Sequence, residues 1–253
     1  MPDITEYAPG TPSWVDLGSP DIAASAAFYS SLFGWECVDQ GEEAGHYTIG
    51  MLRGRAAAAI GPAMNPGPPY WTTYFSVADA DATATLIAEA GGTVVVPPMD
   101  VMDVGRMAVA QDPTGGFFSI WQPRAHIGSE IVNEPGALCW NELQTRDVDT
   151  ALAFYERVFG FTTKRNAEYN EIELGGRIIA GCMAMPAEVP AEVPTNWLVY
   201  FAVDDTDTSV ARAQELGASV VVPAMDIPDV GRFAVLSDPQ GAVFAVIKMT
   251  MPT

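Results

Sequence analysis

Histidine, cysteine and basic residues are scarce in this sequence of 253 residues. It contains 2 His and 3 Cys, and 12 Lys and Arg stand against 32 Asp and Glu, which gives a net charge of −20. Three scattered cysteines are too few for a disulfide framework or a zinc site of the Cys-x-x-Cys type. The negative charge would repel phosphate backbones, so we expect no nucleic-acid partner and interpret the acidic surface as a solubilising one.

Long apolar runs are also missing. No run approaches the roughly 20 residues that are needed to cross a bilayer, and the start MPDITEYAPG has neither the basic nor the apolar segment of a signal peptide. We therefore expect a cytoplasmic protein with no membrane partner. Hydrophobic residues make up 49% of the chain, with 6 Trp and 11 Phe, which is enough apolar material for packed globular cores.

The sequence repeats itself at a spacing of 126 residues. The stretch PPMDVMDVGRMAVAQDPTGG at 97–116 returns as PAMDIPDVGRFAVLSDPQGA at 223–242, and Trp71 recurs in the same register as Trp197. The spacing between the copies changes only in the middle of each copy, where Arg55 matches Arg177 at a spacing of 122 residues. Chance similarity does not keep register over a hundred residues, so the repeat indicates two related domains.

The boundary falls in a stretch of turn-forming residues without clear periodicity. We therefore expect a first domain at 1–122, a linker at 123–136 and a second domain at 137–253. Each domain should hold its own core, and the two should pack as an internal pseudo-dimer.

Each copy has two similar halves, and each half predicts a strand, a helix and three strands. In the first half, Ser19-Pro20-Asp21 opens a helix that Gly34 ends. In the second half, Asp112-Pro113-Thr114-Gly115 is a turn signature before the last strand. The predicted strands of the first copy are 12–18, 36–40, 45–52, 56–61, 71–78, 93–97, 105–111 and 116–122, with helices at about 21–33 and 80–90.

Alternation along the strands assigns side chains to faces. Val15 and Leu17 should pack under the helix, which leaves Trp14 and Asp16 on the opposite, concave face. Each copy then has an aromatic trough that contains one carboxylate. The other side chains expected in the two troughs are Thr72, Tyr74, Phe117, Ser119 and Trp121 in the first copy, and Trp140, Glu142, Gln144 and Tyr200 in the second.

The paired βαβββ order, the helix pattern at 19–35 and 145–161 and the Asp-Pro-x-Gly turn resemble the vicinal oxygen chelate superfamily. That superfamily includes glyoxalase I, extradiol dioxygenases, fosfomycin resistance enzymes and bleomycin-binding proteins. The first strands, the VNEPG linker and the D-V-G-R-x-A-V segments are similar to the two-domain glyoxalase-like proteins of actinobacteria. The resemblance implies an α+β fold of tandem glyoxalase-like domains, each with two βαβββ modules forming a curved mixed sheet around a cavity. It does not specify a reaction, because such folds host many chemistries.

Metal-binding members of this superfamily hold their ion with His, Gln or Glu on four strands of a domain. Carried over by position, these ligands fall at residues that are not strong metal ligands, and the fourth strand offers no imidazole or carboxylate. We therefore expect no metal and no other cofactor. The matching positions are Trp14, Thr72 and Ser119 in the first copy, and Trp140, Leu198 and Ala245 in the second.

Asp16 and Glu142 are the candidate acid–base residues, since a carboxylate among aromatic rings has a raised pKa. Alternatively, each accepts structural hydrogen bonds only. Tyr74 and Tyr200 are the candidate partners in catalysis. The trough aromatics, Trp14 and Trp140 first among them, either stack on a planar ligand or simply pack.

The remaining candidates favour structural roles. Arg106 and Arg232 follow the same Asp-Val-Gly motif, and we expect them to pair with Asp103 and Asp229 across the turn rather than to bind an anionic substrate. Cys139 should alternate onto the helix side. His126 lies in the linker, where we expect a structural role.

The leading hypothesis is a metal-independent protein that binds a small hydrophobic or planar organic molecule in its concave cavities, as drug-binding members of the superfamily do. The alternative is a metal-independent lyase, isomerase or hydrolase-like enzyme that uses Asp16 or Glu142 as its acid–base group. A metal-dependent glyoxalase or dioxygenase is the least favoured interpretation.

Overall fold

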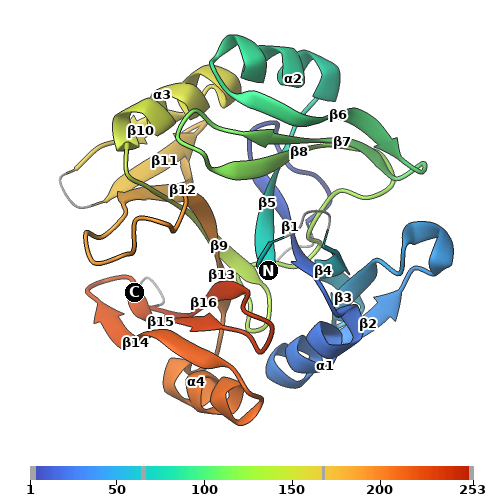
Figure 1. The fold of residues 1–253 in the computed structure, drawn as a ribbon, viewed down its shortest axis with the longest axis vertical. Coiled ribbons are helices and arrows are strands. Elements are labelled where there is room, and N and C mark those ends of the chain that lie inside the picture. The colour runs from blue at the N-terminus through green and yellow to red at the C-terminus, as the bar shows by residue number, and fades with distance from the viewer. Residues whose placement is uncertain (1–3, 64–66, 167–168, 251–253) are drawn as a thin grey trace.

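The computed structural model describes residues 4–63, 67–166 and 169–250, which form two eight-stranded mixed sheets (Figure 1). The α+β class and the two tandem domains, each with a mixed sheet, are therefore confirmed. The first domain comprises β1 (Pro12–Ser19), α1 (Ile22–Phe33), β2 (Glu36–Asp39), a short 3-10 helix (Glu42–Ala44), β3 (Thr48–Leu52), β4 (Arg55–Pro62), β5 (Tyr70–Ser76), α2 (Ala80–Glu89), β6 (Thr93–Val101), β7 (Gly105–Gln111) and β8 (Phe117–Pro123).

The second domain repeats this order. It comprises β9 (Leu138–Thr145), α3 (Val148–Phe159), β10 (Thr162–Lys164), β11 (Asn170–Leu174), β12 (Arg177–Ala184), β13 (Asn196–Ala202), α4 (Thr206–Glu215), β14 (Ser219–Ile227), β15 (Gly231–Ser237) and β16 (Val243–Met249). The strand order of the first sheet is β2-β3-β4-β1-β5-β8-β7-β6, and the second sheet has the corresponding order. The first strand of each domain thus lies near the middle of its sheet, parallel to β4 or β12 and antiparallel to β5 or β13.

The helices begin and end at sequence signals that recur through the chain. The N-cap of every α-helix in the described residues is an Asp whose carboxylate accepts a hydrogen bond from the backbone N–H three residues on. Pro20 lies directly before the N-cap of α1, Asp21. Gly34 and Gly160 end α1 and α3 in the left-handed conformation, at φ of 74° and 71°. No helix among the described residues is long and apolar enough to cross a membrane.

One predicted strand is longer than expected. The strand that was expected to end at Pro97 continues as β6 to Val101, through register shifts between Val94 and Val96 and between Val96 and Met99. The two prolines, Pro97 and Pro98, are tolerated because β6 is the edge strand of the sheet.

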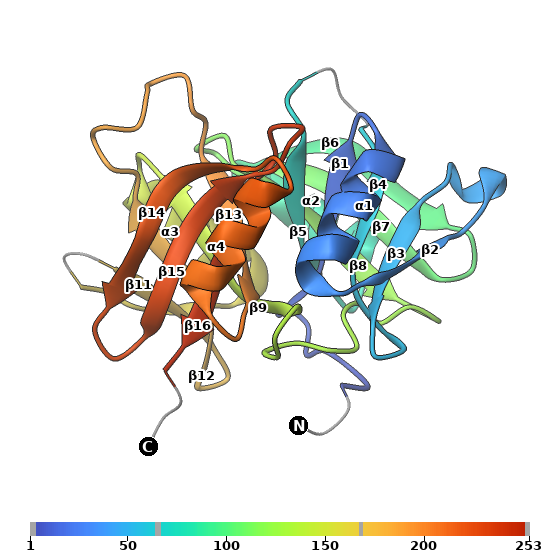
Figure 2. The ribbon, with the colours of Figure 1, turned by 90° about the horizontal axis from the view of Figure 1, so that it is seen from below.

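The helix side of each domain is buried against the other domain. Phe28, Phe33 and Trp35 of the first domain share one apolar cluster with Phe201 and Phe244 of the second. A matching cluster joins the second half of the first domain to α3. Helices α1 and α4 lie together at one end of the molecule and α2 and α3 at the other (Figure 1), and Figure 2 looks onto α1 and α4 between the two sheets. The expectation that each copy holds its own core is therefore wrong for the helix side.

A buried tyrosine–aspartate pair fixes each of these shared clusters. The Tyr29 hydroxyl donates to Asp238 Oδ2 at 3.0 Å and accepts from Trp71 Nε1 at 3.2 Å. Asp238 belongs to the second Asp-Pro-x-Gly turn and also caps that turn through its Oδ1. Burial, and then the Asp238 charge, raise the pKa of Tyr29 well above its ordinary value, so the phenol remains a hydrogen-bond donor.

The second pair repeats this arrangement 126 residues away. Tyr155 donates to Asp112 Oδ2 at 2.9 Å, and Trp197 Nε1 donates to the Tyr155 hydroxyl at 2.8 Å. The turn that the sequence marks before each last strand is thus also the contact that joins the domains.

We predict that residues 1–122 expressed alone will unfold or self-associate, because α1 and the helix side of β5 would lose the partner surface that buries them. Size-exclusion chromatography with light scattering and thermal unfolding measure this. Co-expression with residues 123–253 is the control and should restore a one-to-one complex. A monomeric fragment that melts at the temperature of the full chain would contradict the shared core.

Candidate functional site

The concave faces of the two sheets carry most of the predicted site residues. In the first trough, defined as the concave face of the first sheet, Asp16 lies opposite Thr72 and Trp14 lies opposite Tyr74. Tyr74 is in turn the neighbour of Ser119 on β8. These side chains therefore converge on the middle of the sheet, as the alternation predicted.

Asp16 is the polar centre of the first trough. Its Oδ2 accepts hydrogen bonds from the hydroxyls of Tyr74 at 2.8 Å and Tyr47 at 3.0 Å. Tyr47 accepts a hydrogen bond from Trp14 Nε1 at 3.0 Å, so an indole, two phenols and a carboxylate form one network. Asp16 as a whole residue is half-buried, and the next residue along the same face is Gly18, which has no side chain.

Glu142 is the polar centre of the second trough, the concave face of the second sheet. Its Oε1 accepts from Tyr200 at 3.1 Å and from Gln144 Nε2 at 2.9 Å. The Tyr169 hydroxyl, which accepts from Trp140 Nε1 at 2.8 Å, is a further hydrogen-bond partner of this carboxylate. Gln144 stands where the first domain has Gly18, and Glu142 is only 5% exposed.

Tyr47 and Tyr169 are the site residues that the sequence reasoning missed. They lie 122 residues apart, which is the spacing of the shifted middle segment, and they directly precede β3 and β11. Gly181 makes room for the second of them, since a Cβ there would meet the Tyr169 hydroxyl, and Gly61 gives the Tyr47 ring similar room. The shifted register was therefore the signal that could have identified both tyrosines.

Burial raises the pKa of both carboxylates. The pKa of Asp16 rises to about 6, because desolvation outweighs the hydrogen bonds from Tyr74, Tyr47 and Thr72. Desolvation also raises the pKa of Glu142, against hydrogen bonds from Gln144, Tyr169 and Tyr200. The pKa values of Tyr47 and Tyr74 lie well above the ordinary value, through burial first and the Asp16 charge second. The phenols thus stay protonated and donate to the carboxylate.

The other predicted trough residues differ in position. Trp121 is buried with Trp14 and Tyr74 in the apolar cluster of the first trough. Ser119 Oγ is buried without a hydrogen bond to any described residue. Phe117 stands at the start of β8, is 37% exposed, and lies outside that cluster.

Two expectations about neighbouring side chains were wrong. Cys139 packs against the concave cluster of the second trough, because a register shift on β9 interrupts the alternation there, and burial raises the pKa of its thiol well above the ordinary value. Arg106 pairs with Asp81 and Asp100, not with Asp103.

Arg232 behaves in the same way, pairing with Asp207 and Asp226 rather than Asp229. In both copies the Arg side chain thus ties the edge hairpin of the sheet to the N-terminal turn of α2 or α4, where Asp81 and Asp207 stand. The expectation of a structural role was sound, but its partners come from the helix and not from the turn.

The donor set of the troughs does not fit a divalent metal ion. Transition-metal sites need several imidazole, thiolate or carboxylate ligands, and each trough offers one carboxylate with two phenols. No three His, Cys, Asp or Glu side chains converge within residues 4–63, 67–166 and 169–250.

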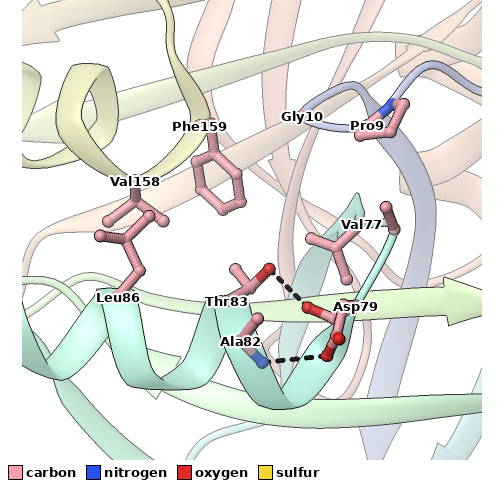
Figure 3. A pocket seen from close by; sticks show the side chains of 10 residues that line it. Pro9, Gly10, Val77, Asp79, Ala82, Thr83, Leu86, Val158 and Phe159 are labelled. Atoms are coloured by element: carbon pink, nitrogen blue, oxygen red, sulfur yellow. Dashed lines mark hydrogen bonds between the residues drawn. The ribbon is translucent and has the colours of Figure 1, made fainter.

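Two surface grooves elsewhere in the fold offer less chemistry. A groove of about 280 Å³ between α2 and α3 is lined by apolar side chains such as Leu86 and Phe159, and its Asp79 carboxylate caps α2 (Figure 3). In a second groove of about 300 Å³, the hydroxyls of Thr114, Thr145 and Thr195 bond to one another.

Comparison with known proteins identifies the family. A model described as "Glyoxalase/Bleomycin resistance protein/Dioxygenase superfamily" matches residues 11–119 and 131–246. The chain is 46% identical over 260 residues to "Putative glyoxylase CFP32" of Mycobacterium tuberculosis, with 98% of each chain covered. It is 39% identical over 266 residues to "Anthracycline biosynthesis protein DauV" of Streptomyces sp. strain C5, with 97% of this chain and 96% of that one covered.

A solved structure agrees in fold. The Mn(II)-bound glyoxalase from Novosphingobium aromaticivorans matches with a TM-score of 0.67 at 17% identity, over 95% of this chain and 82% of that one. The resemblance seen in the sequence is thereby confirmed, and the chain belongs to the glyoxalase/bleomycin resistance protein/dioxygenase superfamily.

Proposed function

We propose that this protein is a metal-independent member of its superfamily that binds a small, planar organic molecule in its concave troughs. The observation that carries the proposal is the repeated site: in each trough one carboxylate, held by tyrosine hydroxyls, stands among aromatic and aliphatic side chains. Such a mainly apolar wall with a few convergent polar groups is typical of small-molecule sites. We place this activity in the cytoplasm.

The relatives support a ligand of this kind. One of them is named for anthracycline biosynthesis, and anthracyclines are planar fused-ring compounds. The aromatic side chains at the troughs, such as Trp14, Trp140 and Phe233, suit rings of that type. Sequestration of a toxic aromatic compound would then give antibiotic resistance without catalysis.

A second candidate function is acid–base catalysis by a metal-independent lyase, isomerase or hydrolase-like enzyme. It is favoured by Asp16, whose pKa of about 6 suits proton transfer near neutral pH and which, unlike Glu142, is only half-buried as a residue. Tyr74 would hold the carboxylate in place and donate to a substrate oxygen. Glu142 and Tyr200 would serve in the same way in the second trough.

The proposal predicts that the protein holds no metal ion. Dialysed protein should contain no stoichiometric Zn, Ni, Mn or Fe by elemental analysis, and ligand binding or turnover should survive chelators, because one carboxylate and two phenols hold such ions poorly. One tightly held equivalent of any of these metals, lost together with activity on chelation, would contradict the proposal.

Substitution of the carboxylates separates the two candidate functions. If the protein is an enzyme, Asp16→Asn or Glu142→Gln should lower turnover by about 10²-fold or more, the usual effect of losing a general acid or base. If it is a binder, the same variants should change affinity by only about 1–2 kcal/mol. The ligand is first identified by native mass spectrometry of protein purified from its host. Unchanged turnover and affinity in both variants would remove the troughs from either role.

The raised pKa of Asp16 predicts a pH-dependent contribution to stability. A carboxyl that holds its proton more tightly in the folded state stabilises the fold at low pH, and this contribution is lost as pH rises from about 4 to about 6. The free energy of unfolding of the wild type, minus that of Asp16→Asn, should therefore fall over this range, by an amount on the order of 3 kcal/mol.

Asp147→Asn is the matched control, because hydrogen bonds from Thr150 lower the pKa of that carboxyl and an Asn still caps α3. The free energy of unfolding of the wild type, minus that of Asp147→Asn, should rise with pH instead, because the folded state holds the proton of Asp147 less tightly. Comparing variants in this way cancels the opposing contribution of His126, whose pKa is lowered by burial. A flat difference for Asp16→Asn would show that its carboxyl titrates normally.

A further inference from the structure

The linker between the domains covers one end of the first trough. We call this end, where β1 and β4 begin and β8 ends, the mouth. The imidazole of His126 lies edge-on to the Trp14 ring, with centroids 4.5 Å apart and planes at 86°. Trp121 Nε1 donates to the His126 carbonyl at 2.8 Å. The His126 ring of the linker thus covers the Trp14 indole at the mouth of the first trough.

The linker backbone also fills the space between β1 and β4, which pair only from Asp16 and Ala59 onward. Ser129 N donates to the Ser13 carbonyl at 2.7 Å, and Glu130 N donates to the Ala56 carbonyl at 2.8 Å. The Glu130 carboxylate accepts from Ala56 N at 2.9 Å. As a result Ala56 is 6% exposed and Trp14 is 3% exposed.

The mouth of the second trough is open in the described residues. Ile178 stands where the first domain has Ala56 and is 47% exposed, while Trp140 is only half-buried. Val230, 47% exposed, stands where Val104 packs against the first trough, and Ile247 replaces Trp121. No described segment bonds to Ile178 as the linker bonds to Ala56.

We propose that the mouth of the second trough, and not that of the first, receives the ligand, and that this ligand is a planar aromatic molecule that is uncharged or cationic. The inference rests on the proposed small-molecule function. The first domain shows which chemistry fits the mouth, since there an aromatic ring covers the indole. In the second domain a ligand would take the place on Trp140 that the His126 ring takes on Trp14. Phe233 and Ile247 would form further apolar walls of this site.

The charge of the surrounding protein determines which ligands can approach this mouth. Glu142 follows Trp140 on the same face of β9, deeper in the trough, and the chain as a whole carries a net charge of −20. The net negative charge disfavours an anionic ligand, whereas a neutral ring or a cation is not repelled.

The test uses the full chain and 1,4-dihydroxyanthraquinone, a planar and uncharged probe, in a fluorescence and calorimetric titration. One equivalent should bind. Trp140→Leu and the rim variant Ile178→Asp should each weaken binding at least about tenfold. Val221→Asp, at a 53% exposed position on the edge strand β14, is the matched control and should bind as the wild type does. Anthraquinone-2-sulfonate, the anionic analogue, should bind at least about tenfold more weakly.

His126→Ala tests the first mouth. It should leave the affinity of the first equivalent unchanged, and a second, weaker equivalent would support the linker's role as a cover. Loss of binding in His126→Ala, two equal equivalents in the wild type, or binding that ignores Trp140→Leu and Ile178→Asp would overturn the assignment to the second mouth while leaving small-molecule binding intact.

Two further results would show either that the chain's own last residues take this mouth or that the proposed function itself is wrong. A variant that ends at Thr250 should keep the wild-type affinity, and markedly tighter binding would assign this mouth to the chain's own last residues instead. Absence of binding in the wild type and in His126→Ala alike would overturn the proposed function together with this inference.

Discussion

A module with one helix over a curved sheet cannot bury its helix side alone, and the rest of the structure depends on how this chain solves that problem. Each module packs against a module of the other domain, so no strand of one sheet pairs with a strand of the other, but the two sheets share their cores. The hydroxyl of Tyr29 in one cluster, and of Tyr155 in the other, reaches a turn carboxylate of the opposite domain. Because these groups are buried, each needs its partner, which fixes the relative position of the domains as well as their association.

Packing the helix sides in this way leaves the concave faces free for chemistry. A carboxylate buried there without a cation is costly unless hydroxyls donate to it. In both troughs tyrosines supply that donation, and an indole holds one of the phenols in place. The network keeps Asp16 in a defined geometry, yet desolvation still raises its pKa to about 6. A bound metal ion would also neutralise a buried carboxylate, but it would require several imidazole, thiolate or carboxylate ligands in place of the tyrosines.

Local signals predicted much of this structure, and long-range contacts account for what they missed. Alternation placed Trp14, Asp16 and Tyr74 on one face, because the side-chain period of a strand is fixed by its geometry. It failed at Cys139, where a register shift changes the face, and a bulge has no sequence mark as clear as alternation. Tyr47 was missed because it enters the trough from just before β3, in the segment where the spacing between the copies changes from 126 to 122 residues.

The core shared between domains was also beyond local reasoning. Phe28 and Phe33 show at helical spacing that one face of α1 is buried, but the spacing does not say against which surface. The partner of Arg106 was misjudged for a related reason, since Asp81 lies far away in sequence and comes close only after the sheet folds back under α2. The spacing of apolar residues in the sequence therefore identifies the buried faces, while the tertiary fold determines which surface covers each of them.

Joining two such domains in one chain makes them unequal. A linker must leave the last strand of the first domain and reach the first strand of the second, and on this path it lies across only one of the two mouths. Tyr29 and Tyr155, which join the domains, are identical in the two copies, because each depends on the same contact with the other domain. The trough residues differ, with Gly18 against Gln144 and Trp121 against Ile247, because the linker has already given the two troughs different surroundings. Duplication thus keeps the interface symmetric and leaves the concave faces able to diverge.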